Sequence, residues 1–321
     1  MFTYKKKTIL LAGLTIFLLT ANLQAGRKKE ISKTFEAMKT VRINTVSGDC
    51  LVKVGDNDKI DVQLTYTYMP EDNFEPIFQI KGSSLYLEED MIGSTYGSAL
   101  WTVTVPAETR INFSTASGDF TADDLKGRIS VETASGDIEL SNCNCNIKAQ
   151  TASGDIQLTD SEGDFNLEIA SGDITVSDCK GVFELNSASG DIETDNCRGE
   201  FELNAASGDI EALKTFIEEA STFDVASGDV YVELAETAEF NLSLSSASGN
   251  ATLNYNGHPV RGYFELTARE DRGDIRAPFP FDDEEVFERY DRDYVSKSFT
   301  LSTDTPSITI ETATGKAVLE K

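Results

Sequence analysis

The chain has 321 residues, of which 40% are hydrophobic and 26% charged, so it is too apolar for a disordered chain and long enough for one large or two ordinary domains. The 28 Lys and Arg residues against 55 Asp and Glu residues give a net charge of −27, which argues against nucleic acid as a partner because phosphate contacts need cationic side chains. A single histidine, His258, leaves little room for sites that depend on several histidines.

Residues 1–25 are predicted to be a secretory signal peptide. A basic stretch at Lys5, Lys6 and Lys7 precedes an apolar run from Ile9 to Leu19, and Ala25 offers a small residue for cleavage before Gly26. An uncleaved membrane anchor is the alternative. No later stretch approaches the ~20 apolar residues needed to span a bilayer. We therefore expect an extracytoplasmic protein, located in the periplasm, at the cell surface or secreted, with no membrane span after cleavage.

Residues 26–116 are predicted to form irregular β rungs at the N-terminal end. Strand-like runs occur at 41–45, 60–68, 74–80, 84–88 and 100–105. The tripeptide Ser47-Gly48-Asp49 is an early copy of a motif that recurs later in the chain. These segments are expected to be wider coils with insertions that lead into a regular stack.

Residues 117–250 contain a repeat. A Ser-Gly-Asp triplet starts every 18 residues at Ser117, Ser135, Ser153, Ser171, Ser189 and Ser207, and it recurs at Ser227 and, as Ser-Gly-Asn, at Ser248. A short fixed period over many copies is typical of a stacked repeat architecture.

Each repeat alternates apolar and polar residues with a period of two, as in Ile156 and Leu158 and again in Phe165, Leu167 and Ile169. This pattern predicts two short strands with one buried face. One turn is Ser-Gly-Asp, and the other, as in Asp160-Ser161-Glu162-Gly163, has the signature of a type I turn. The fold class is therefore predicted to be all-β, a parallel β-solenoid with about 18 residues per rung, capped by irregular β segments. A two-sheet antiparallel sandwich is the alternative.

Residues 251–321 are predicted to form a charged, aromatic C-terminal segment that caps the stack. Open sheet ends invite edge-to-edge aggregation, so a solenoid needs a cap. The run from Ile308 to Thr312, followed by Thr314-Gly315-Lys316, is expected to be the last rung.

Several of these residues carry a resemblance to a known family. Val105-Pro106, an alternating strand and Thr115-Ala116-Ser117-Gly118-Asp119 resemble the bacterial "putative adhesin" domain-of-unknown-function family of β-strand-repeat proteins. The Ser-Gly-Asp-Ile copies and the closing Thr312-Ala313-Thr314-Gly315 share this resemblance, which covers roughly residues 40–320. It implies the repeat architecture and an adhesin-like role, with no established ligand or site residue.

Two rows of Asx residues are the most suggestive chemical feature. The first consists of Asp119, Asp137, Asp155, Asp173, Asp191, Asp209 and Asp229, and the second of Asp124, Asn142, Asp160, Asp178 and Asn196. Stacked carboxylates can supply the oxygen ligands that Ca²⁺ prefers, so a calcium-dependent repeat module is one hypothesis. We favour the interpretation that each Asx side chain points outward and bonds the backbone of its own turn.

The sequence predicts no catalytic, cofactor-binding or metal residue, and no cofactor. A polysaccharide-active β-helix enzyme remains an alternative because a glycosidase needs only two carboxylates, but no long loops are predicted to wall a cleft. A row of exposed polar side chains could bind sugars or could simply face solvent: Glu132, Gln150, Glu168, Asn186 and Asn204.

Five cysteines occur, at Cys50, Cys143, Cys145, Cys179 and Cys197, and an odd number in an exported protein leaves at least one thiol unpaired within the chain. Cys143, Cys179 and Cys197 occupy the repeat position of Leu125 and Ser161, which indicates a small inward-facing site. Since Cys179 and Cys197 are 18 residues apart, they are the pair expected to bridge if any long-range disulfide forms.

Together these patterns predict a non-enzymatic, exported cell-envelope β-solenoid that serves as an adhesin-like display or binding scaffold. Its partner is expected to be a surface ligand such as a glycan or an envelope protein, and its oligomeric state is left open.

Overall fold

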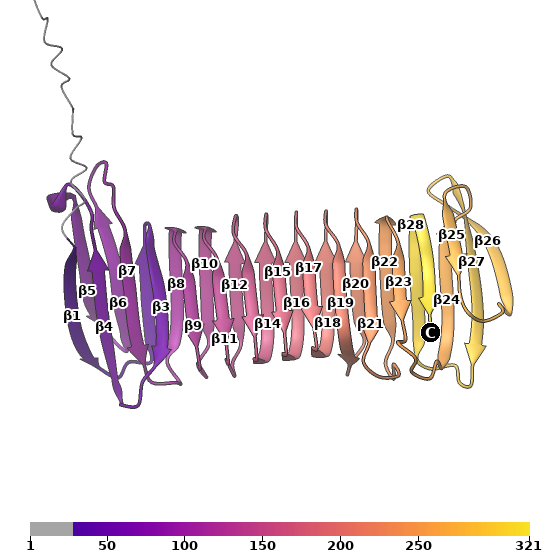
Figure 1. Cartoon of the computed structure of the whole chain (residues 1–321), viewed down its shortest axis with the longest axis horizontal. Coiled ribbons are helices and arrows are strands. Elements are labelled where there is room, and N and C mark those ends of the chain that lie inside the picture. Colours follow the sequence, from indigo (N-terminus) through magenta and orange to yellow (C-terminus); the bar gives the residue numbers. More distant parts are fainter. Residues whose placement is uncertain (1–27) are drawn as a thin grey trace, which may run out of the picture.

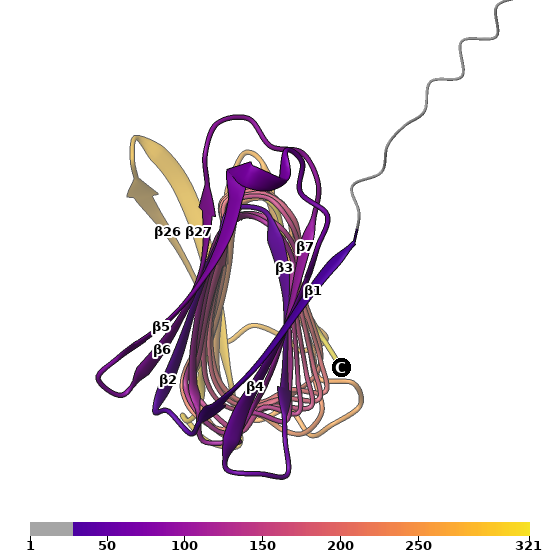
Figure 2. The same cartoon turned by 90° about the vertical axis from the view of Figure 1, so that its left-hand side faces the viewer.

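The computed structural model describes residues 28–321, so the predicted signal peptide lies outside the described residues. The described chain consists of 28 strands and one short 3₁₀ helix, Glu71–Asn73. The all-β prediction is confirmed. The strands lie side by side along a rod (Figure 1), and the view along the rod shows a flattened coil whose two long sides are sheets (Figure 2). No helix within residues 28–321 is long and apolar enough to cross a membrane.

The middle of the rod is built from parallel strands that alternate between the two sheets. Ile129 pairs with Ile147 in one sheet and Ile138 with Ile156 in the other, so paired residues lie 18 positions apart. We call the sheets A and B, and one strand of sheet B with the following strand of sheet A a rung. Sheet B here contains β8 (Arg110–Ser117), β10 (Ile129–Ser135), β12 (Ile147–Thr151), β14 (Glu162–Ile169), β16 (Lys180–Ser187), β18 (Arg198–Ala205), β20 (Ser221–Val225) and β22 (Leu242–Ser248). Sheet A contains β9 (Phe120–Asp123), β11 (Ile138–Ser141), β13 (Ile156–Thr159), β15 (Ile174–Ser177), β17 (Ile192–Asp195), β19 (Ile210–Ile217), β21 (Val230–Leu234) and β23 (Ala251–Asn254).

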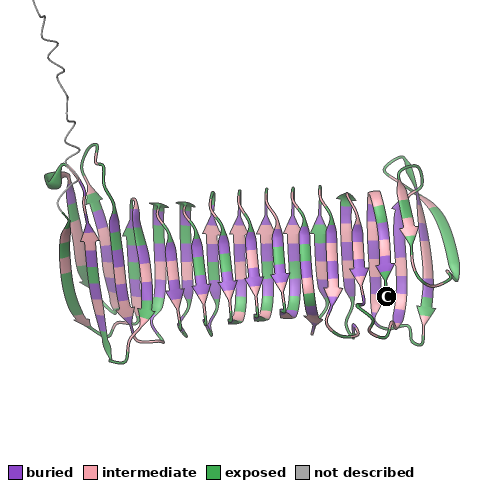
Figure 3. Ribbon diagram, in the orientation of Figure 1, coloured by how far each residue is buried: buried purple, intermediate pink, exposed green. Residues whose placement is uncertain are grey.

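The core is a thin layer between the sheets, made of side chains that repeat from rung to rung. Successive residues of a strand point to opposite faces, and in the regular rungs buried residues alternate with more exposed ones along the strands (Figure 3). Phe165, Phe183, Phe201 and Phe223 stack in sheet B with ring centroids 5.3, 4.7 and 5.9 Å apart. Each repeat therefore buries its apolar face only against its own opposite sheet and its two neighbours.

The Ser-Gly-Asp turn requires glycine for two reasons, as Gly154 shows. Its φ is +136°, a conformation that other residues rarely adopt, and a Cβ at this position would collide with the carbonyl oxygen of Gly136 in the previous rung. The predicted role of the glycine is confirmed at this position.

The second turn differs from the predicted type I turn. At Asp160 the chain turns with a φ of +49°, and strand β14 already begins at Glu162. A type I turn over residues 160–163 would need a non-extended backbone at Glu162, its third residue. Asx residues recur at this corner because they tolerate the left-handed conformation better than most other side chains.

At the N-terminal end the spatial order of the strands differs from their order in the chain. Strands β2 and β3 stack directly on β8 and β9, while β6 and β7 lie one rung further out. Strands β1, β4 and β5 pair antiparallel with their neighbours and finish this end. The bounds are β1 (Lys29–Glu36), β2 (Thr40–Thr45), β3 (Gly48–Val54), β4 (Lys59–Tyr66), β5 (Phe74–Lys81), β6 (Ser84–Met91) and β7 (Ala99–Val105).

The C-terminal end shows a similar inversion. The long strand β28 contributes to both sheets and is inserted between β22 and β24, with Leu242 and Phe264 on either side of Ile308. The prediction that residues 308–316 form the last rung is therefore wrong, because β24 and β25 lie beyond them and antiparallel β27 and β26 close sheet B. The bounds are β24 (Gly262–Arg269), β25 (Gly273–Arg276), β26 (Asp283–Arg289), β27 (Arg292–Leu301) and β28 (Ser307–Glu320).

Candidate functional site

The aspartates of the first row form a hydrogen-bonded ladder along one edge of the rod. The Oδ1 atom of Asp137 accepts a hydrogen bond from the backbone N–H of Asp155 at 2.9 Å, and Oδ1 of Asp155 accepts one from the N–H of Asp173 at 3.0 Å. The same contact recurs from Asp49 at one end to Asn250, whose Oδ1 accepts from the N–H of Lys316, at the other.

These side chains therefore bond the next rung and not their own turn. The predicted outward, exposed position of the aspartates is correct, but the predicted partner is wrong. The bond reaches across to the next rung because consecutive turns stack in register, which places the following N–H directly beside each carboxylate. The ladder thus has a structural role, since each carboxylate satisfies a backbone donor at the margin of sheet A.

The second row of Asx residues makes side-chain contacts of another kind. Asn142 donates to Oδ1 of Asp123 at 2.8 Å, and Ser141 donates to the same atom at 2.8 Å. These two hydrogen bonds, from Asn142 first and then Ser141, hold the pKa of Asp123 below its usual value. Nowhere within residues 28–321 do three or more His, Cys, Asp or Glu side chains converge as metal ligands would.

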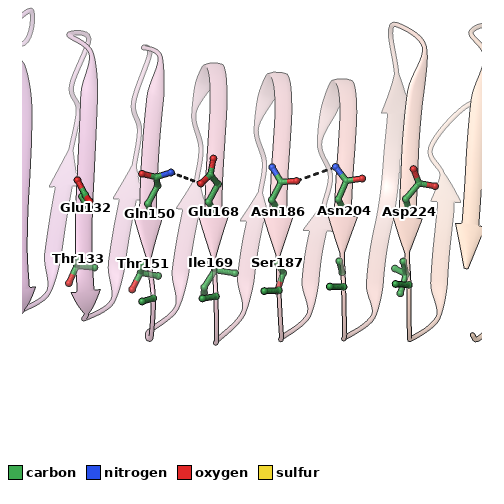
Figure 4. Close-up of a pocket in the computed structure, with 17 residues that line it drawn as sticks. Glu132, Thr133, Gln150, Thr151, Glu168, Ile169, Asn186, Ser187, Asn204 and Asp224 are labelled. Atoms are coloured by element: carbon green, nitrogen blue, oxygen red, sulfur yellow. Dashed lines mark hydrogen bonds between the residues drawn. The ribbon is translucent and has the colours of Figure 1, made fainter. Parts of the chain in front are cut away.

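A groove with a volume of about 920 Å³ runs along sheet B across successive rungs (Figure 4). Two rows of outward side chains line it, a polar row of six residues and an alanine row of five. The polar row consists of Glu132, Gln150, Glu168, Asn186, Asn204 and Asp224. Two residues further along each strand or turn, the alanine row consists of Ala152, Ala170, Ala188, Ala206 and Ala226.

The alanine row creates the groove because its side chains are too short to fill the space beside the longer polar row. The residues between the two rows point inward and are buried, as Ile169 and Val225 are. The groove therefore has an apolar strip along its length and a line of hydrogen-bonding groups beside it.

Hydrogen bonds between rungs hold the polar row in place. Gln150 donates to Glu168, and Asn204 donates to Oδ1 of Asn186 at 3.1 Å (Figure 4). At the end of the row, burial is the main cause that raises the pKa of Asp224, and the carboxylates of Glu202 and Glu311 add to it, against a hydrogen bond from Ser245. No Lys or Arg lines the groove.

The structure brings together five residues that the sequence singled out, since Glu132, Gln150, Glu168, Asn186 and Asn204 form one continuous row. Sequence reasoning missed Asp224 and the alanine row. The signal was present, because Ala precedes almost every Ser-Gly-Asp triplet, but a small exposed residue does not stand out unless its larger neighbours are known.

The cysteines are all buried free thiols. Cys143, Cys179 and Cys197 share an inward-facing position with Leu125 and Ser161, as predicted. The Cys179 thiol donates to the Ser177 carbonyl at 3.1 Å and the Cys197 thiol to the Asp195 carbonyl at 3.5 Å. The neighbouring Cys197 thiol and burial raise the pKa of Cys179.

Several solved structures are similar to this chain over most of its length but share little sequence with it. A "putative cell adhesion protein" from Clostridium sporogenes has 14% identity and a TM-score of 0.28, and the match covers 92% of this chain and 99% of that one. A "putative adhesin" from Bacteroides fragilis has 13% identity, a TM-score of 0.33, and coverage of 91% and 97%. Another from Parabacteroides merdae has 11% identity, a TM-score of 0.39, and coverage of 92% and 97%. None of these likenesses identifies a ligand.

None of the curated proteins compared with this chain matches it. A family model does match, and it covers residues 94–276, which is more than half of the chain and includes most of the regular rungs and the whole groove. On this match, the chain belongs to the Toastrack DUF4097 family.

Proposed function

We propose that this protein is an exported, non-enzymatic cell-envelope β-solenoid, with about 18 residues per rung, that binds a linear neutral glycan along the groove of sheet B. The groove is the observation that carries the proposal. The 18-residue strand register supports the solenoid, and the order of basic, apolar and small residues in 1–25 supports export.

The periodicity of the groove favours a ligand that itself repeats. Adjacent strands lie ~4.8 Å apart, so the polar row presents a hydrogen-bonding group at that interval and the alanine row an apolar contact beside it. A linear polymer can make the same contact with each rung, and weak contacts that are repeated along one chain add up to useful affinity.

The chemistry of the lining favours hydroxyl groups over charged groups. Asn186 and Asn204 offer amide donors and acceptors, and Glu132, Glu168 and Asp224 offer carboxylate acceptors, all of which suit sugar hydroxyls. Without a cation in the lining, the groove would repel an acidic polysaccharide. The apolar alanine strip suits the face of a sugar ring.

Binding of neutral and acidic linear polysaccharides to residues 26–321, measured by calorimetry, tests the proposal. The double variant Ala170→Gln/Ala188→Gln fills the groove without changing charge, and should abolish binding of the neutral polymers. Asn186→Ala/Asn204→Ala should weaken it about tenfold or more. The matched control is Thr175→Gln, an exterior position on sheet A.

Circular dichroism shows whether each variant is folded. Binding of neutral polymers that Thr175→Gln leaves unchanged and Ala170→Gln/Ala188→Gln removes would support the groove as the binding site. Binding that survives in the filled variant, or binding only of acidic polymers, would overturn the proposal.

A further inference from the structure

The outer face of sheet B carries a second pattern beside the groove, on the same strands. One row of outward residues changes from basic to acidic along the rod; on β14, β16 and β18 it follows Glu162, Lys180 and Arg198, which do not share this trend. In strand order from β8 to β18 the row consists of Arg110, Arg128, Asn146, Asp164, Val182 and Glu200.

The neighbouring row on the same face changes in the same direction. Its charged members are Arg42 on β2, Lys148 on β12, Glu184 on β16 and Glu202 on β18. Four cations thus lie toward the N-terminal end of this face, in a chain whose net charge is −27. The acidic members Asp164, Glu184, Glu200 and Glu202 lie toward the C-terminal end.

Two of the acidic residues accept side-chain hydrogen bonds within the chain, Asp164 from Asn146 at 2.9 Å and Glu184 from Asn166 at 2.6 Å. Within residues 28–321, however, none of the eight charged residues is ion-paired. Arg110 and Arg128 lie on adjacent strands, linked by the backbone hydrogen bond from Ile111 N–H to the Arg128 carbonyl, and like charges in such positions are destabilising. Folding alone does not explain the arrangement.

From this pattern we infer that two copies of the chain associate through the outer faces of their B sheets, with the rods antiparallel. A two-fold axis parallel to the strands keeps each row opposite the same row of the second copy and reverses the order of the rungs. With the axis between β12 and β14, Arg110 faces Glu200 of the second copy, and Arg128 lies beside Glu184 of that copy. Because the interface is isologous, the same contacts form twice.

The size of the face suits a dimer. The ten neighbouring strands from β2 to β28, at ~4.8 Å spacing and ~17 Å length, present on the order of 800 Å² per copy, which is the area of a standard protein interface. This area includes the groove, so a second copy and a glycan in the groove would exclude each other. Val182, 41% exposed, adds an apolar contact between the two charged halves.

An anionic polymer fits this face less well than a second copy does. It would meet the acidic half of the same rows as well as the basic half. A second copy presents both signs in reversed order, so each half finds its complement, and screening over ~8 Å at physiological salt limits the repulsion between the net charges.

Sedimentation of residues 26–321 without any ligand tests the inference separately from glycan binding. At 0.15 M salt the protein should have twice the mass of one chain, and at about 1 M salt, where the screening length falls to ~3 Å, it should dissociate. Arg110→Glu/Arg128→Glu and Glu184→Lys/Glu200→Lys should each weaken self-association about tenfold or more. Lys53→Glu/Lys316→Glu, a matched reversal on sheet A, should not.

The decisive samples combine the two reversals. A chain with all four substitutions has opposite charges again at both contacts, 110 with 200 and 128 with 184, and should dimerise again, and an equimolar mixture of the two double variants should form heterodimers. The inference would be overturned if the wild-type chain were monomeric at all concentrations, or if the charge-reversing substitutions left the dimer unchanged. A monomer that binds polyphosphate through Arg110 and Arg128 would also overturn it, because the face would then be an anionic-polymer site.

Discussion

The carboxylate of Asp155 accepts a hydrogen bond from the backbone N–H of Asp173, 3.0 Å away in the next rung. The turn residues around it also bond rung to rung, since the N–H of Gly154 donates to the Ser171 carbonyl and the N–H of Ile156 to the Asp173 carbonyl. The N–H of Asp155, between these two donors, donates to Oδ1 of Asp137 in the previous rung, so each aspartate satisfies the one donor of the following turn that the backbone leaves open. The repeated Asp of the sequence therefore continues the rung-to-rung hydrogen bonding of sheet A through the turn.

Asp155→Ala should lower the free energy of unfolding by about 1 kcal/mol. A hydrogen bond to a charged group contributes about 1.5–3 kcal/mol, less when exposed, and loss of the carboxylate also relieves repulsion from Asp137 and Asp173. Asp155→Asn should cost less, because an amide oxygen can accept the same bond, as that of Asn250 does from Lys316. Chemical denaturation of both variants measures the difference in the free energy of unfolding. An equal loss of stability in the two variants would contradict the role of the Asp155 side-chain oxygen as a hydrogen-bond acceptor.

The repeats explain why so much of this fold follows from the sequence. The 18-residue period, the inward Ile156 and Leu158 and the left-handed glycines are local features, and each is repeated often enough to be read without knowledge of contacts. The partner of each Asp is not local, because it is fixed by how the turns stack.

The ends of the rod could not be predicted in this way. Nothing in the order of the chain shows that β28 inserts between β22 and β24, because one strand edge can pair with several others. Glu89 is a second example: it is buried, accepts from Trp101 Nε1 at 2.9 Å and from Val46 N–H at 2.9 Å, and so serves the first Ser-Gly-Asp turn from a distant strand.

Metal chelation should leave the melting temperature unchanged at moderate salt. The carboxylates of the ladder are already hydrogen-bonded to backbone donors, so the stack needs no ion to form. Lowering the ionic strength to about 0.01 M should instead lower the melting temperature, because the screening length then reaches ~30 Å and the stacked carboxylates repel. Scanning calorimetry with a chelator and with added calcium measures both effects. Unfolding on chelation that micromolar calcium reverses would favour the calcium-dependent module.

Asp224→Asn should stabilise the protein at pH 7. The pKa of Asp224 is raised in the folded state, chiefly by burial, so its ionised form costs stability above that pKa. As the pH falls through the raised pKa the carboxyl takes up a proton and the cost disappears. The difference in melting temperature between wild type and variant should therefore vanish at a pH below about 4, where the carboxyl is protonated in both states.

Asp123→Asn is the matched control for this pH dependence, with the opposite sign. Its pKa is lowered by the Asn142 and Ser141 hydrogen bonds, so the ionised carboxylate stabilises the fold at neutral pH and this contribution is lost as the pH falls. The variant should be less stable than wild type at pH 7 and should approach it in acid. A stability change of the same sign at pH 7 in both variants would contradict the opposite pKa shifts of Asp123 and Asp224.

Mild oxidation should link Cys179 to Cys197 before any other long-range pair. The two residues occupy equivalent positions in adjacent rungs, and the ~4.8 Å spacing of strands lies within the ~4.4–6.8 Å Cα separation that a disulfide tolerates. Cys143 is two strands away from Cys179, about 9.6 Å, because Ser161 occupies the rung between them. Peptide mapping should find the 179–197 link and should lose it in Cys197→Ser. A link between Cys143 and Cys179 would show that the rungs are out of register.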